Sequence, residues 1–174
     1  METVRDCIRK RRSIRRFTDK PVNRDILCAL IGDACQAPSG SNIQPWEYVI
    51  VDEPSLLHSI TTYSPGIGRC PPAMIVLCAD QERALQKGGK LGKEQLALMD
   101  ISMAAENLIL SAVERNLGTC AVKSFPVQVI GKLLDLPDHV VPELIVILGE
   151  PAMQPQSPPK RNTESLIHYN GWGK

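Results

Sequence analysis

The sequence lacks several features that would point to particular classes of protein. It has six cysteines but no C-x-x-C pair, and no stretch approaches the roughly 18 consecutive apolar residues that span a bilayer. The opening residues METVRDCIRKRR contain no apolar core of a signal peptide. Neither a disulfide framework nor a zinc site is indicated, and we expect a cytoplasmic protein that does not insert into a membrane.

Charge of one sign is not in excess either. The formal net charge is +1 at pH 7, which argues against a globally basic coat for nucleic acid, although local clusters remain possible. Aromatic residues make up only 4% of the chain, whereas hydrophobic residues make up 43% and charged residues 22%, close to the average for soluble globular proteins. A length of 174 residues fits one domain over residues 1–174 with an aliphatic core.

Catalytic and nucleotide-binding motifs of the common kinds are also missing. The three histidines, His58, His139 and His168, are too dispersed for a metal site or a catalytic triad, so we expect each to be structural and no metal to be bound. The glycines of KGGKLGK are too close together for a phosphate-binding loop, and Glu94 stands where that loop needs Ser or Thr. Gly66-x-Gly68 lacks the third glycine of a dinucleotide fingerprint.

Hydrophobic periodicity and turn residues predict the order of elements along the chain. We expect helices at 4–11, 24–37, 55–61, 94–117 and 126–134, strands at 47–51, 73–79, 119–122 and 143–149, an irregular connection at 64–72 and a flexible turn at 87–93. Residues 150–174 lose all periodicity and contain four prolines, so an extended C-terminal arm is expected there rather than a second domain.

A basic segment near the N-terminus can bind anions. Residues 11–17 read RRSIRRF and carry four guanidinium groups and one hydroxyl. Arginine offers a planar, permanently charged fork that suits phosphate oxygens, and Ser13 can donate to the same group. A solvated basic helix end is the alternative interpretation, because charge runs usually face solvent.

A second segment, APSGSNIQPW at residues 37–46, comes just before a predicted strand. Gly40 allows the chain to approach a flat ligand closely, and the Asn and Gln amides can pair with the edge of a heteroaromatic ring. An ordinary helix-to-strand loop with Trp46 as a core anchor explains the same residues.

These two segments in this order resemble the nitroreductase family. Three later blocks extend the resemblance over most of the chain: the predicted helix at 100–112 followed by NLGTC at 116–120, ILGEP at 147–151, and a basic and aromatic end running from KR at 160–161 to IHYNGW at 167–172. The resemblance implies an α+β fold with a central, mainly antiparallel sheet flanked by helices. It also implies an intertwined homodimer with two FMN sites at the interface.

The resemblance assigns roles to individual residues. It places Arg11, Arg12 and Ser13 at the phosphate or ribityl end of FMN, Arg15 near the pyrimidine edge, and Lys160 or Arg161 around the phosphate. The other subunit would supply Pro38, Ser39, Ser41 and Asn42. Lys123 and Ser124 occupy the place from which family members direct backbone N–H groups toward flavin N5, but the usual glycines are absent there.

The implied activity is transfer of electrons from NAD(P)H through flavin N5 to a small oxidised acceptor, such as a nitroaromatic or a quinone, by a ping-pong mechanism. No acid–base pair is required, and Arg15 is the electrostatic candidate beside the edge of the flavin where negative charge grows. A flavin-binding sensor or flavin handler of the same fold is one alternative. A module that binds polyanions through residues 9–16 is a remote one, and no nucleic acid is expected as a partner.

Overall fold

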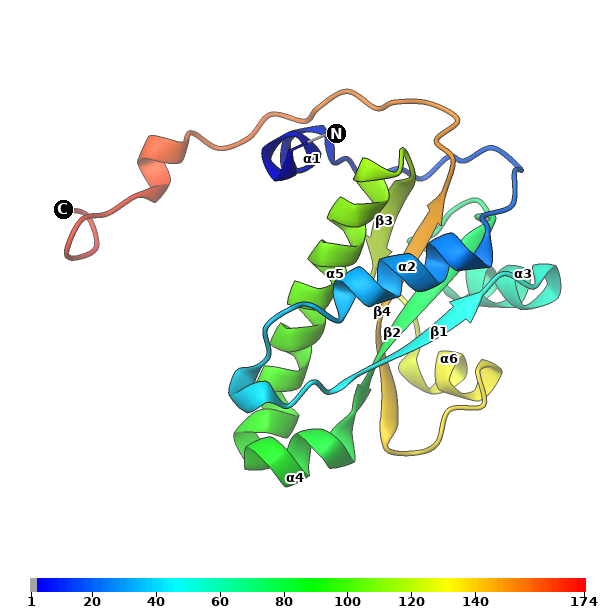
Figure 1. Ribbon diagram of the computed structural model, residues 1–174, viewed down its shortest axis with the longest axis horizontal. Coiled ribbons are helices and arrows are strands. Elements are labelled where there is room, and N and C mark those ends of the chain that lie inside the picture. Colours follow the sequence, from blue (N-terminus) through cyan, green and yellow to red (C-terminus); the bar gives the residue numbers. More distant parts are fainter. Residues whose placement is uncertain (1–2) are drawn as a thin grey trace.

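The computed structural model describes residues 3–174, so Met1 and Glu2 lie outside the described residues. Its elements build an α+β arrangement around one four-stranded sheet (Figure 1). The α-helices are α1 (Val4–Lys10), α2 (Arg24–Ala34), α3 (Pro54–Tyr63), α4 (Gln81–Leu91), α5 (Ala97–Glu114) and α6 (Val127–Leu133). The strands are β1 (Trp46–Val51), β2 (Ala73–Asp80), β3 (Gly118–Val122) and β4 (Val140–Gly149), and three short helical segments are η1 (Gly40–Asn42), η2 (Gly92–Leu96) and η3 (Thr163–Leu166).

The sheet has the order β1-β2-β4-β3, and every neighbouring pair of strands is antiparallel. Strand β2 lies inside the sheet, and all of its residues except Asp80 are buried. A strand that is covered on both faces reads as a continuous apolar run, as AMIVLCA does. The predicted central, antiparallel sheet is confirmed.

Helices cover both faces of this sheet, and the alternation along β2 shows how the two cores are separated. Ile75 and Leu77 pack with α2 and α5 in one buried cluster. Met74 and Val76 point to the other face, where the second cluster includes residues of α3 and α6. The fold class expected from the sequence is therefore correct.

One element prediction was wrong: residues 87–93 do not form a flexible turn. Lys87 to Leu91 complete α4, and the π-helical turn η2 joins α4 to α5. The glycines serve close packing, because a Cβ on Gly88 would lie 2.4 Å from Ile43 Cδ1 and one on Gly92 would lie 2.4 Å from the carbonyl oxygen of Ala84. Only Gly89 leaves the helical region, with φ 60° and ψ −155°.

The continuous helical run Gln81–Glu114 contains 34 residues and is long and apolar enough, by length and composition alone, to cross a membrane. Several of its apolar residues, including Ile101 and Leu108, belong to the buried cluster on the sheet. A core helix passes the same test of length and composition, so the run is weak evidence for a membrane span.

After Gly149 the chain leaves the sheet and passes above α1 toward the C-terminus (Figure 1). Every residue from Ala152 onward is exposed, and η3 is the single helical turn in this segment of the described chain. The four prolines between Pro151 and Pro159 prevent longer regular structure here.

Candidate functional site

The basic segment at residues 11–17 lies along the edge of β3. Ser13 forms a parallel bridge with Thr119, and the Ile14 amide donates to the Thr119 carbonyl oxygen at 2.8 Å. Ile14 and Phe17 are buried and anchor the segment. Gly118 makes this approach possible, because any Cβ there would lie 2.8 Å from side-chain atoms of Ile14.

Three of the predicted site residues, Arg11, Ser13 and Arg15, lie in the segment beside this edge. Burial raises the pKa of the Cys120 thiol on β3, whereas the charge of Arg15, a hydrogen bond with Ser13 and the charge of Arg11 oppose that rise. The charges of Arg15 and Arg11 and the Ser13 hydroxyl therefore all act on the same thiol. Ser13 and Arg15 are exposed and Arg11 is half-buried, so the group faces solvent over a buried floor.

Arg12 has a different environment from Arg11, Ser13 and Arg15. Its Nη1 donates to the carbonyl oxygens of Arg9 and Arg11, both at 2.7 Å, at the end of α1. It lines a cavity of about 660 Å³ between α1, the end of α5 and the start of the C-terminal arm. The structure thus separates Arg12 from the Arg11, Ser13 and Arg15 group, which sequence reasoning had not done.

Lys123 and Ser124 follow directly after β3. The Lys123 ammonium is 2.6 Å from Glu143 Oε2 and 5.6 Å from the centre of the Phe125 ring, so its charge is directed to β4 and to that ring. A Cβ on Gly66 would lie 2.3 Å from Ser124 Oγ. The connection between α3 and β2 therefore packs against the residues that follow β3. The one arginine of this connection, Arg69, pairs with Asp19 at 3.2 Å.

The amide-rich segment connects α2 to β1 and turns sharply at η1. Ser41, Asn42 and Gln44 have φ angles of 50°, 52° and 51°, a region that residues other than glycine rarely adopt. Pro38, Ser41 and Asn42 are exposed, and the Ser39 hydroxyl accepts from the Gln44 amide at 3.1 Å. Such backbone conformations cluster at ligand-binding sites, where the surrounding structure enforces them.

Two charged residues that sequence reasoning missed hold this segment in place. Asp100 on α5 is 1% exposed, and its Oδ1 accepts from the Gly40 amide at 3.0 Å. Arg83 on α4 donates from Nε to the carbonyl oxygens of Ile43 at 2.7 Å and Gln44 at 3.0 Å. A lone carboxylate within the apolar run LALMDISMA was the available signal for Asp100.

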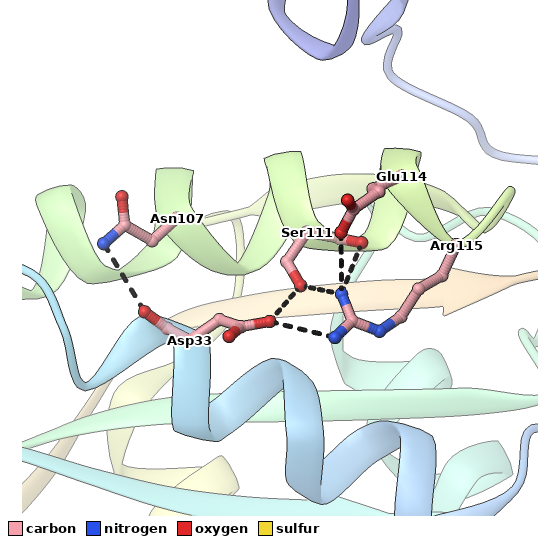
Figure 2. A network of polar contacts seen from close by, with 5 residues as sticks. All are labelled: Asp33, Asn107, Ser111, Glu114 and Arg115. Carbon is pink, nitrogen blue, oxygen red and sulfur yellow. Dashed lines mark hydrogen bonds and ion pairs between the residues drawn. The ribbon is translucent and has the colours of Figure 1, made fainter. Parts of the chain in front are cut away.

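A polar network also fixes the last turn of α2 to α5 (Figure 2). The Asp33 carboxylate accepts from the Ser111 hydroxyl and pairs with Arg115 at 3.2 Å, while Arg115 also pairs with Glu114 at 3.5 Å. The Asn107 amide approaches the Asp33 carbonyl oxygen at 3.5 Å. The start of the amide-rich segment is therefore set by α5 as well.

The basic and amide-rich segments do not meet within one chain. The amide-rich segment contacts Asp100 near the start of α5, whereas the basic segment packs on Gly118 just beyond its end (Figure 1). From Asp100 to Glu114 the helix rises about 21 Å at 1.5 Å per residue. Lys160 and Arg161 are exposed on the C-terminal arm.

Comparison with known proteins decides the family. The model of the nitroreductase family matches residues 8–64 and 59–150, which together make up most of the chain. The chain belongs to the nitroreductase family. The resemblance inferred from the sequence is confirmed.

Relatives in this family carry names of flavin and nicotinamide enzymes. The chain is 32% identical over 168 residues to the oxygen-insensitive NADPH nitroreductase of Salmonella typhimurium, and the match covers 91% of this chain and 70% of that protein. It is 28% identical over 190 residues to the FMN reductase [NAD(P)H] of Bacillus subtilis, covering 97% of this chain and 74% of that protein. A nitroreductase family protein of Clostridium difficile 630 superposes with a TM-score of 0.85 at 24% identity, covers 98% of this chain and 99% of that chain, and shows the same fold.

Proposed function

We propose that this chain is an FMN-dependent oxidoreductase that takes electrons from NAD(P)H and passes them to a small oxidised acceptor by a ping-pong mechanism. Membership of the nitroreductase family and the names of the relatives support NAD(P)H-dependent flavin chemistry. The observation that carries the assignment to this chain is the placement of the basic segment along the edge of β3, where Ser13 pairs with Thr119 and the side chains of Ser13 and Arg15 are exposed.

The residues present fit a flavin mononucleotide. The phosphate end of FMN is a dianion that needs guanidinium and hydroxyl donors, and Arg11 and Ser13 provide both. The buried floor formed by Ile14 and β3 is apolar. A buried Thr119 hydroxyl with no hydrogen-bond partner among the described residues lies on the same edge strand.

When bound, FMN supplies the redox chemistry, because its N5 accepts a hydride and the reduced ring passes electrons on. The protein's own contribution is placement of charge. We assign Arg15 to the pyrimidine edge, where its fixed positive charge stabilises negative charge that grows on reduction. The main-chain N–H groups at Lys123 and Ser124 are proposed to face N5, since the Lys123 side chain is already engaged by Glu143. Arg12 is proposed to act on the phosphate through the main chain that it braces.

A second copy of the chain is proposed to complete each site. The amide-rich segment lies beside the start of α5, too far from the end of that helix to reach the basic segment of its own chain. We therefore propose that its residues Pro38, Ser39, Ser41 and Asn42 contact the flavin held by the partner. Lys160 or Arg161, on the arm at residues 150–174, is proposed to close around the phosphate. Residues 1–174 then act as one domain.

Exposed apolar side chains support this dimer. On α1, Val4 is 72% exposed and Ile8 is 55% exposed, and on α5 Met99 is 58% exposed and Met103 is 37% exposed. Each pair is spaced i, i+4 and therefore forms a stripe on its helix. Helix α1 packs on α5. Apolar surface of this kind marks an interface.

Steady-state kinetics test the proposed reaction. With NADH or NADPH varied against a panel of nitroaromatics, quinones and enones, we expect parallel double-reciprocal lines, because the nicotinamide leaves before the acceptor enters. Intersecting lines for every acceptor would contradict the ping-pong mechanism. A protein that binds FMN but turns over none of the panel would favour the sensor or flavin-handling alternative.

A further inference from the structure

Asp100 is a buried carboxylate on α5. It lies on the face of α5 that carries Ile101 and Ala104 into the core. Its Oδ1 accepts from the Gly40 amide, whereas its buried Oδ2 has no hydrogen-bond partner among residues 3–174. Burial of a carboxylate with one oxygen unpaired is unfavourable, and it raises the pKa of Asp100.

Arg83 makes a matching contact from the other side of the same segment. Its Nε donates to two consecutive carbonyl oxygens, those of Ile43 and Gln44. Helix α4 presents Arg83 at this point because Asp80 caps the helix, accepting from the Arg83 amide at 2.8 Å. The ends of the turn at η1 are thus held by one carboxylate and one guanidinium, each through main-chain atoms.

The held segment has a backbone that would not keep its shape by itself. Ser41, Asn42 and Gln44 all lie in the left-handed region, which disfavours residues with a Cβ. Such conformations persist only where neighbouring groups enforce them. The buried Ile43 between them, packed against Gly88 and Gly92, is the third anchor.

We propose that Asp100 and Arg83 are positioning residues that hold residues 38–44 in the conformation that contacts flavin. The proposal rests on the proposed function, because that function assigns Pro38, Ser39, Ser41 and Asn42 to the FMN bound by the partner. Neither residue touches the cofactor. Each acts through the main chain. Because the segment is already ordered before FMN binds, the free energy of binding does not include the entropic cost of ordering it.

The decisive experiment compares FMN affinity with thermal stability in four variants of the full chain. Asp100→Leu removes the acceptor for the Gly40 amide, whereas Asp100→Asn keeps an oxygen in the same place. Arg83→Met keeps the stem and removes the donors. Ile130→Val, in the core on the opposite face of the sheet, is the control that lowers stability without touching the segment.

We expect Asp100→Leu and Arg83→Met each to raise the Kd for FMN, measured by fluorescence titration of the apoprotein, by tenfold or more. Asp100→Asn should stay within threefold of the wild type. Ile130→Val should lower the unfolding midpoint while its Kd also stays within threefold. Rescue by Asn together with this control separates positioning from a general loss of stability.

Unchanged FMN affinity in a folded Asp100→Leu protein overturns the proposal, as does a Kd that merely follows the unfolding midpoint across all four variants. If Asp100→Leu does not fold, Arg83→Met decides, and unchanged affinity in that variant overturns the proposal. Wild-type protein with no affinity for FMN would overturn the proposed function and this assignment with it. Normal wild-type binding with unaffected variants would overturn this assignment alone.

Discussion

Replacement of Arg11 and Ser13 by alanine tests the assignment of the basic segment. Neither side chain supports the core, since Ser13 is exposed, Arg11 is half-buried, and the buried Ile14 and Phe17 anchor the segment. The double variant should therefore fold. The variant should lose affinity for FMN, because it lacks two donors to the phosphate.

The size of that loss follows from the donors removed. A hydrogen bond to a charged group contributes about 1.5–3 kcal/mol, and a hydroxyl bond contributes about 0.5–1.5 kcal/mol. The sum, about 2–4.5 kcal/mol, corresponds to a rise in the Kd for FMN of between about 30-fold and 1,600-fold at 1.4 kcal/mol per tenfold.

Equilibrium titration of the apoprotein with FMN, followed by quenching of flavin fluorescence, measures this change. Lys132→Ala on α6 is the matched control, because it removes one exposed positive charge from an element outside the basic segment. Arg12→Ala should lose less affinity than Arg11→Ala, because the Arg12 guanidinium is already bonded to main-chain carbonyl oxygens. A double variant that binds FMN within threefold of the wild type would refute the assignment.

Three further predictions concern stability and assembly. Ile14→Ala should lower the free energy of unfolding in urea by about 2–5 kcal/mol, because it empties a buried position at the β3 edge; a change below about 0.5 kcal/mol would show that the segment is not anchored there. Met99→Glu with Met103→Glu should shift the protein from dimer to monomer in sedimentation, because both side chains are exposed on the proposed interface; an unaltered dimer would place the interface elsewhere. The bidentate contact of Arg24 with Asp52, at 2.5 and 2.8 Å, lowers the pKa of Asp52. A carboxyl group with a lowered folded-state pKa stabilises above its unfolded pKa of about 3.9 and loses that effect as the pH falls through the folded value. Arg24→Ala should thus be less stable than wild type at pH 7 and equal to it at the acid end of that window, as urea unfolding across pH would show; a difference that persists there would contradict the pairing.

Much of the architecture could be predicted from local patterns. The run AMIVLCA was identified as a buried strand because it is continuous in apolar residues and bounded by turn residues, and it forms β2. The helix predicted at 24–37 forms α2, and the side chain of Asn23 caps it by accepting from the Asp25 amide at 2.8 Å. In such cases the local signal and the tertiary packing agree.

The sequence misled where glycines serve packing rather than flexibility. Three glycines in KGGKLGK predicted a turn, but Gly88 and Gly92 allow α4 and η2 to approach Ile43 and Ala84 closely. The contact with Ile43 joins residues that are more than 40 positions apart. A local sequence pattern therefore could not show that these glycines serve packing. Helix propensity is a weak signal that tertiary contacts override.

In the candidate site too, the residue types could be predicted from the sequence, whereas their arrangement depends on tertiary contacts. Residue types indicated that Arg11, Ser13 and Arg15 bind an anion, but the separation of Arg12 from them depends on where α1 ends. Asp100 and Arg83 act on a segment 39 to 60 residues earlier in the chain through main-chain atoms, which carry no sequence signature.

Anaerobic visible spectroscopy of the purified protein tests the central proposal most directly. FMN-loaded protein should show the yellow absorbance of an oxidised flavin, lose it on addition of NADH or NADPH, and regain it when a quinone or nitroaromatic is added. A colourless protein that takes up no added FMN would contradict flavin binding, and a yellow protein that neither nicotinamide bleaches would contradict the proposed reaction.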